Sequence, residues 1–222
     1  MTTLAMPKPH GDHPIKGLGA KWYAASTAEA LKDYTELAQR IASQLAEGSA
    51  VLEVAPGPGY LSIELAKLGS YAITGLDLSP DFVKIAARKA AEAGVKVDFK
   101  QGSASSLPFP KESFDFLVCR AAFKNFGDPV GALQEMCRVL RPGGRGLIVD
   151  LRRDASKDGI SRHVDRMGFT GFNRVVNRQI FKLFLLRSAY TRVELERMVA
   201  QASFSSVQIV EEEIGLEISL TK

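Results

Sequence analysis

Short apolar runs alternate with stretches of helical periodicity between about residues 50 and 151, and this alternation constrains the fold most. The runs VLEVA, AITGL, FDFLVC and GLIVDL hold few polar positions, as strands buried on both faces do. Strands that alternate with helices of about 10–15 residues form βαβ units and a parallel sheet. The pattern therefore predicts an α/β fold: a Rossmann-like doubly wound sheet with helices on both faces.

The same pattern places the individual elements. Before the alternation, a capping-box pattern at residues 26–29 predicts the start of an amphipathic helix that continues to about Glu47. Ser79 and Pro80 have the residue types of a helix N-cap and first turn. The predicted strands are 50–55, 71–76, 96–100, 114–119 and 146–151, and the predicted helices between them are 59–68, 79–93 and 129–140.

The C-terminal third has a different pattern. Residues 156–187 are predicted to be helical and are basic. A second capping box at 191–194 opens a helix to about Ala202. Residues 207–211 and 215–220 then alternate as two strands, which we expect to pair antiparallel. The predicted sheet is therefore mostly parallel, with a C-terminal antiparallel strand pair.

A glycine-containing turn at residues 51–60 (VLEVAPGPGY) carries the strongest functional signal. It follows a predicted strand and opens a helix. Gly57 and Gly59 have no Cβ, so the backbone there can approach a ligand closely, and the helix N-terminus offers free N–H groups. The carboxylate of Glu53 at the strand end would repel a pyrophosphate. The turn is therefore suited to a cationic ligand, such as one that carries an amino group.

A second carboxylate ends the next predicted strand. Asp77 lies 24 residues after Glu53. In open α/β sheets, a carboxylate at this position accepts hydrogen bonds from ribose hydroxyls. Ligands bind outside the carboxyl ends of the strands, where the strand order reverses. The two acids therefore predict a nucleoside site at that edge of the sheet.

Four segments in order resemble the motifs of class I S-adenosylmethionine-dependent methyltransferases. Residues 51–60 resemble motif I, and GLDLS (75–79) resembles the ribose motif. GSASSLPFPKESFDFLVCR (102–120) resembles the adenine loop and fourth strand, and LRPGG (140–144) resembles the turn before the fifth strand. The resemblance covers about residues 45–151 and is nearest to the small-molecule type, similar to the ubiquinone and menaquinone methyltransferase group.

The resemblance implies S-adenosylmethionine as cofactor, S-adenosylhomocysteine as product, and a set of cofactor contacts. Two positions depart from the family pattern: Ala55 stands where the first glycine of motif I is usual, and Ser103 stands where an acid is usual. We expect binding to survive both changes. The predicted cofactor-binding residues are Glu53, Ala55, Pro56, Gly57, Gly59, Tyr60, Asp77, Leu78, Gly102, Ser103, Ala104 and Arg120.

The acceptor side is less defined, and the sequence carries no diagnostic catalytic motif. The candidate catalytic residues are Tyr23, Asp150 and His163. The candidate substrate contacts are Tyr23, Lys124, Asn125 and Phe126. Structural roles remain alternatives: a hydrophobic staple for Tyr23, a helix start for Lys124 and Asn125, a loop cap for Asp150, and an exposed helical position for His163. Arg120 also has a surface ion pair as its alternative.

The domain organisation and partners follow from composition and from the resemblance. We expect residues 1–19 to form a flexible arm and residues 20–222 to form one methyltransferase domain with a helical basic insert at about 156–190. No signal peptide or apolar stretch of about 18 residues occurs, so the cytoplasm is the expected location. Cys119 and Cys137 are predicted to be buried free thiols.

Methyl transfer to a small molecule, of aromatic or lipophilic character, is the favoured function. An RNA or protein methyltransferase and a non-catalytic cofactor-binding module are the alternatives. The net charge of +4 gives no reason to expect a nucleic acid partner. His10 and His13 lack further ligands nearby, so no metal is expected. The basic insert is interpreted as an acceptor lid, a face for peripheral membrane contact or a packed helix, and the chain as a monomer or homodimer.

Overall fold

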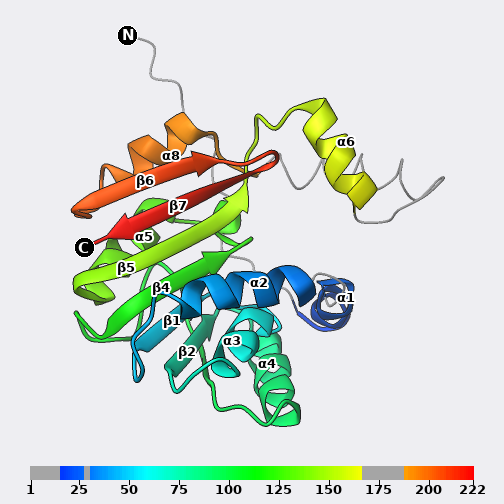
Figure 1. The fold of residues 1–222 in the computed structure, drawn as a ribbon, viewed down its shortest axis with the longest axis vertical. Helices are drawn as coiled ribbons and strands as arrows, with labels where there is room; N and C mark the ends of the chain where they lie inside the picture. The colour runs from blue at the N-terminus through cyan, green and yellow to red at the C-terminus, as the bar shows by residue number, and fades with distance from the viewer. Residues whose placement is uncertain (1–15, 28–30, 167–187) are drawn as a thin grey trace.

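The computed structural model describes residues 16–27, 31–166 and 188–222. In this part of the chain, seven strands form one sheet in the order β3-β2-β1-β4-β5-β7-β6 (Figure 1). The strands are β1 (Ala50–Val54), β2 (Ala72–Asp77), β3 (Asp98–Gln101), β4 (Phe114–Arg120), β5 (Leu140–Leu151), β6 (Ser206–Glu211) and β7 (Gly215–Thr221).

The strand directions confirm the predicted fold class. The first five strands pair parallel to one another, and β7 pairs antiparallel with both β5 and β6. After β1, the chain builds β2 and β3 on one side and then returns to place β4 on the other side of β1. The strand order therefore reverses between β1 and β4, which is where such sheets bind ligands.

Helices cover both faces of the sheet. Figure 1 shows α2, α3 and α4 in front of it, and α5 and α8 behind it. The helices are α1 (Leu18–Thr27), α2 (Leu31–Ala42), α3 (Tyr60–Ala66), α4 (Pro80–Glu92), α5 (Pro129–Val139), α6 (Lys157–Arg166) and α8 (Arg192–Val199), and η2 (Phe123–Asn125) is a 3-10 turn.

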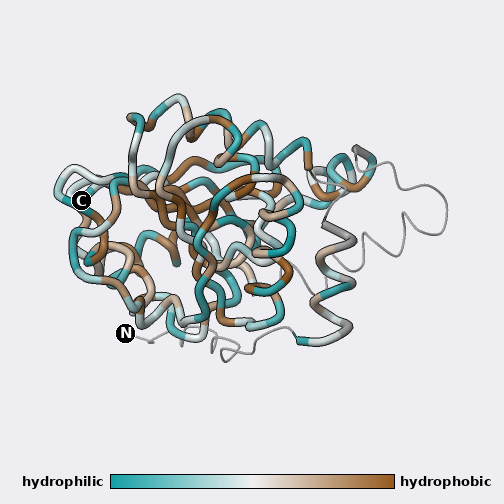
Figure 2. The backbone as a smooth tube through the Cα atoms, turned by 90° about the horizontal axis from the view of Figure 1, so that it is seen from below, coloured by the Kyte–Doolittle hydropathy of each residue, from teal (hydrophilic) through white to brown (hydrophobic). Residues whose placement is uncertain are grey.

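Alternate strand positions supply the two apolar layers. Val51 and Val118 point toward α2 and α3, whereas Leu52 and Leu117 point toward α5 and α8. All four of these side chains are fully or almost fully buried. In Figure 2, the hydrophobic backbone segments gather in the middle of the molecule and the hydrophilic ones lie around them. This alternation is what a sheet covered on both faces requires.

Local signals in the sequence set several of the observed boundaries. Ser79 caps α4 by accepting a hydrogen bond from the Phe82 N–H, and Pro80 is the first residue of that helix. Thr191 and Glu194 form the predicted capping box of α8. The antiparallel pairing of β6 with β7 is confirmed. Cys119 and Cys137 are buried free thiols, as expected.

Several boundaries differ from the prediction by a few residues, and two segments differ in kind. Ser26 and Thr27 end α1 instead of opening a helix, because the preceding run from Leu18 is itself helical and contains three alanines. The next helix begins at Leu31, and residues 28–30 lie outside the described residues. The LRPGG segment was expected to be a turn before the fifth strand, but it forms the irregular first part of β5, where the pairing with β4 changes register.

The basic insert is described only in part. Its first residues form α6, where Ile160 and Val164 pack against Ile214 near the end of β5. Residues 167–187, and residues 1–15 of the predicted arm, lie outside the described residues. Across the described ranges, no helix combines the length and the apolar character needed to cross a bilayer.

Candidate functional site

A cavity opens at the point where the strand order reverses. It is walled by the turn after β1, the end of β2, residues 102–104, the end of β4 with the residues after it, and by α1 and α2. Its empty volume is about 990 Å³, including the open mouth. The cavity therefore lies at the edge of the sheet where open α/β folds bind their ligands.

The two glycines of the turn after β1 have different roles. Both adopt left-handed backbone conformations, with φ of 55° at Gly57 and 80° at Gly59. A Cβ on Gly57 would meet no described protein atom closer than Tyr23 Cε1 at 3.9 Å, so the space above it is open to a ligand. A Cβ on Gly59 would lie 2.8 Å from both Ala86 and Phe99. Gly59 therefore allows close packing of α3 and is not part of the cavity wall.

Asp77 is held at the cavity because both of its carboxylate oxygens accept hydrogen bonds from backbone N–H groups. Oδ2 accepts the Gly57 N–H at 2.9 Å, and Oδ1 accepts the Ser79 N–H at 2.8 Å. Burial raises the pKa of Asp77, whereas the bonds from Ser79 and Gly57 oppose that rise. A carboxylate has about four lone-pair sites, so capacity for further donors remains. Asp77 is therefore held in a fixed orientation at the cavity, with capacity to accept further hydrogen bonds.

Glu53 lies beside Asp77, at the end of the neighbouring strand. Its side chain caps α3: Oε2 accepts the Ser62 N–H at 2.9 Å and a short hydrogen bond from the Ser62 hydroxyl. Burial raises the pKa of Glu53 to about 7, although Ser62 and the nearby Arg120 lower it. The carboxyl group thus changes protonation near neutral pH, and a cation placed next to it would favour the ionised form.

Arg120 ends β4 and contributes the only cationic side chain among the described residues of the cavity wall. Its guanidinium carbon lies 4.0 Å from the centroid of the Tyr34 ring, and Nη2 lies 3.8 Å from the exposed Asp33 carboxylate. Burial raises the pKa of Tyr34 to about 12, so the phenol stays protonated beneath the guanidinium. Glu53 and Arg120 therefore offer opposite charges in one part of the cavity.

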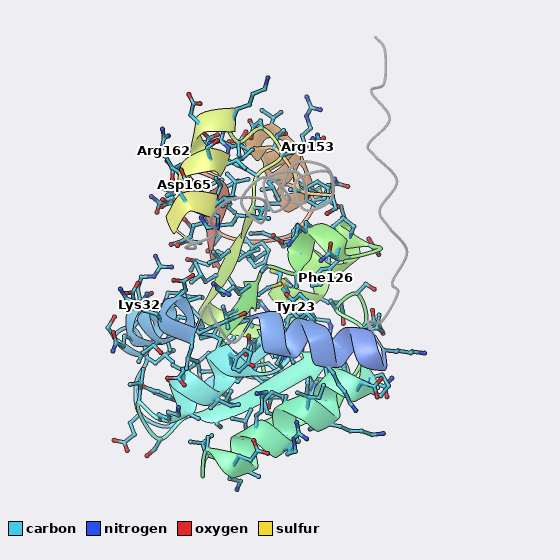
Figure 3. The ribbon with its side chains drawn as sticks, turned by 90° about the vertical axis from the view of Figure 1, so that its right-hand side faces the viewer. Tyr23, Lys32, Phe126, Arg153, Arg162 and Asp165 are labelled. Carbon is cyan, nitrogen blue, oxygen red and sulfur yellow. The ribbon has the colours of Figure 1, made fainter. Side chains whose placement is uncertain are left out.

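Helix α1 carries Tyr23, which is labelled in Figure 3 and lines the cavity. The Tyr23 ring packs edge-on against Phe82, with centroids 5.7 Å apart. The hydrogen bonds that hold α1 include the Gly17 N–H to Asp81 at 2.8 Å and the Tyr60 hydroxyl to the Ala24 carbonyl at 2.7 Å. Tyr60 thus anchors α1 and, like Gly59, does not line the cavity.

The structure brings most of the predicted cofactor residues together. Gly59 and Tyr60 are the exceptions. The predicted residues that line the cavity are Glu53, Ala55, Pro56, Gly57, Asp77, Leu78, Gly102, Ser103, Ala104 and Arg120. The Ser103 hydroxyl, which replaces the usual acid, is hydrogen-bonded to the Ser105 hydroxyl at 3.0 Å.

The acceptor-side candidates divide into two groups. Tyr23, Asn125 and Phe126 line the cavity. Lys124 does not, because its ammonium group is paired with Asp150 at 2.8 Å behind the cavity wall. Asp150 is likewise outside the wall, and His163 lies on α6, away from it. Among the described residues, no group of three or more side chains suits a metal ion, and His10 and His13 lie outside them.

Sequence reasoning missed several wall residues, notably Tyr34 and Phe82. Each lies on a helix whose local pattern indicates only an amphipathic surface. The sequence did give one indication for Phe82: the predicted N-cap at Ser79 places it in the first turn of α4, where its N–H donates a hydrogen bond to the Ser79 hydroxyl. The other missed wall residues are Val54, Pro58, Leu76, Ala121 and Ala122.

Comparison with known proteins agrees with this geometry. Residues 52–148 match the family model described as a methyltransferase domain. These residues form a domain of the class I S-adenosylmethionine-dependent methyltransferases, and S-adenosylmethionine is the cofactor of that class. Within the class, the chain is similar to the ubiquinone and menaquinone group.

Individual relatives support the same assignment. A ubiquinone/menaquinone biosynthesis C-methyltransferase of Bdellovibrio bacteriovorus is 42% identical over 106 residues, 46% of this chain and 44% of the relative. A demethylmenaquinone methyltransferase of Deinococcus radiodurans is 35% identical over 141 residues, 63% of this chain and 53% of the relative. The chain thus aligns with about half the length of these curated relatives.

A solved structure matches the whole fold. A protein of Methanococcus maripaludis, assigned as an S-adenosylmethionine-dependent methyltransferase, superposes with a TM-score of 0.75. It covers 100% of this chain and 97% of its own, at 22% identity. At that identity the likeness shows the fold alone, and it extends over the C-terminal strand pair as well as the parallel strands.

Proposed function

We propose that this protein transfers the methyl group of S-adenosylmethionine to a quinone-related small molecule. The observation that carries the proposal is the pair of acids, Glu53 and Asp77, at neighbouring strand ends beside the open space above Gly57. A pyrophosphate-bearing dinucleotide would be repelled by these acids. A nucleoside with two ribose hydroxyls and a cationic amino acid group matches them.

Different residues of the cavity bind different parts of the cofactor. Asp77 accepts the ribose hydroxyls. Glu53 attracts the amino group and Arg120 the carboxylate of the methionine part. Leu78 and Phe82 supply an apolar surface for the adenine ring. The bound cofactor supplies an electrophilic methyl group on a sulfonium centre, so the protein's contribution is orientation and the exclusion of water.

The acceptor side of the cavity supports an aromatic or lipophilic substrate. Its wall consists of Ala121, Ala122 and Phe126, with the amide of Asn125 as a polar group among them. The small alanines leave room, and Phe126 gives a flat ring against which a planar acceptor can pack. Tyr23 on α1 covers the glycine turn and limits the access of water from the mouth.

Methyl transfer from radiolabelled S-adenosylmethionine to 1,4-naphthohydroquinone, kept reduced, tests the proposal. We expect a methylated hydroquinone detectable by mass spectrometry, and much less product with Asp77→Ala at the same subsaturating concentration of S-adenosylmethionine. A catechol, an alkyl thiol, total RNA and denatured cell protein serve as competing acceptors. Label in RNA or protein alone would favour the macromolecular alternative. Cofactor binding without label in any acceptor would favour the non-catalytic module.

A further inference from the structure

A buried ion pair lies directly behind the acceptor wall. Lys124 Nζ lies 2.8 Å from Asp150 Oδ1, and their side chains are 6% and 9% exposed. Asp150 Oδ2 also accepts the backbone N–H of Lys124 at 2.9 Å. One carboxylate on β5 therefore holds both the backbone and the side chain of a single residue in η2.

The same ammonium group also controls the backbone at the start of the wall. Lys124 Nζ donates to the Ala121 carbonyl at 2.7 Å. Ala121 has φ of 57°, a left-handed conformation that L-residues other than glycine rarely adopt. Its own N–H donates to the Val149 carbonyl at 2.8 Å. Bonds from both sides thus hold Ala121 in a conformation that it does not prefer.

The residues on either side of Lys124 form the acceptor wall. Ala121 and Ala122 precede it, and Asn125 and Phe126 follow it. Phe123 points the other way and is 1% exposed, packed against Phe126 with ring centroids 5.5 Å apart. The direction in which the wall residues face the cavity therefore depends on the ion pair and on the Phe123 anchor behind it.

We infer that Lys124 and Asp150 are positioning residues that hold residues 121–126 in the geometry needed for the acceptor. They do not touch the acceptor themselves. The inference rests on the proposed function for the identity of that acceptor, but the clamp itself is a property of the described residues. This role differs from the substrate contact and the general base for which their residue types qualify them.

Lys124→Met removes the ammonium group and keeps an unbranched side chain. We expect kcat/KM for 1,4-naphthohydroquinone to fall roughly tenfold to a hundredfold, the effect of a displacement of about 1 Å. The dissociation constant of S-adenosylhomocysteine should stay within about twofold, because none of the atoms that hold Glu53 or Asp77 changes. Hydrogen exchange of residues 121–126 should become faster. Asp150→Asn, which keeps an acceptor for the Lys124 N–H, is the second variant if Lys124→Met folds poorly.

Rescue by glycine separates positioning from direct chemistry. Ala121→Gly removes the backbone penalty that the Lys124 bond opposes. The double variant Ala121→Gly/Lys124→Met should therefore recover most of the lost kcat. Glu112→Gly/Lys124→Met is the matched control, because Glu112 also has φ of 57° but lies outside the cavity wall. That control should raise stability without recovering kcat.

The outcomes distinguish this inference from the proposed function. Loss of kcat that Ala121→Gly does not recover would assign Lys124 a direct chemical role and overturn the inference. Unchanged exchange at residues 121–126 in both Lys124→Met and Asp150→Asn would also overturn it. If the wild-type protein methylates no acceptor, the proposed function fails, and the exchange measurements then decide the clamp independently.

Discussion

Cofactor binding should release a proton from Glu53 below neutral pH. The free protein holds this carboxyl with a pKa of about 7, because burial outweighs the bonds from Ser62 and the attraction of Arg120. At pH 6, about nine-tenths of the molecules therefore carry a protonated Glu53. The α-amino group of the cofactor has a pKa of about 7.7–8.0 and is charged at that pH. Binding next to this cation requires the ionised carboxylate.

The size of the effect follows from the same pKa. Close to one proton should be released per bound cofactor at pH 6, and only a small fraction of a proton at pH 7.5. Below pH 7, the apparent affinity should fall roughly tenfold for each pH unit, which corresponds to about 1.4 kcal/mol per unit. The affinity should be highest between the pKa of Glu53 and that of the cofactor's amino group, where the carboxylate is already ionised and the amino group is still charged.

Isothermal titration with S-adenosylmethionine in MES and in imidazole buffer at pH 6 measures this release directly. The two buffers differ in ionisation enthalpy, so the observed heats should differ by that amount multiplied by the number of protons released. Glu53→Gln is the control, because it keeps an acceptor for the Ser62 N–H but cannot lose a proton in this range. Equal heats in the two buffers for the wild-type protein would refute the assignment of Glu53 to the amino group.

Three further predictions concern the same site. Asp77→Ala should weaken cofactor binding about tenfold to a hundredfold, since charge-assisted hydrogen bonds contribute roughly 1.5–3 kcal/mol. Fluorescence titration at pH 8 measures the affinity, and an unchanged value would remove Asp77 from the site. Without cofactor, the free energy of unfolding of the wild type should fall by up to roughly 3 kcal/mol relative to that of Glu53→Gln as the pH rises from about 4.5 to 7, because the folded state binds the Glu53 proton more tightly than the unfolded chain does. If urea titrations give the same difference between the two proteins at pH 5 and at pH 8, this prediction is contradicted. Ala55→Gly should raise the free energy of unfolding by up to about 1 kcal/mol and keep the cofactor affinity, because Ala55 has φ of 57°, a left-handed conformation that is unfavourable for alanine. A lower stability in guanidinium titration would refute this.

The sequence predicts the parts of the fold and site that depend on local pattern. The sheet follows from apolar runs of strand length, and the caps of α4 and α8 follow from residue types at fixed spacing. Glu53 and Asp77 were found because their strand ends are readable in the sequence. Parallel strands bring such ends to one edge, so the neighbouring position of the two acids follows from topology alone.

The parts that were missed depend on contacts between distant segments. Gly57 and Gly59 look equivalent in the sequence, but only the packing of Ala86 and Phe99 against Gly59 separates their roles. Lys124 and Asp150 qualify by residue type for substrate contact and for base catalysis, but their ion pair spans 26 residues and removes both from the cavity wall. No local pattern encodes such a pairing.

A crystal structure with S-adenosylhomocysteine would show whether the two acids hold the nucleoside. We expect both ribose hydroxyls on the Asp77 carboxylate, the amino group facing Glu53, and the backbone of Gly57 against the ligand. A nucleoside bound elsewhere, or a phosphate-bearing cofactor between these two acids, would contradict this expectation.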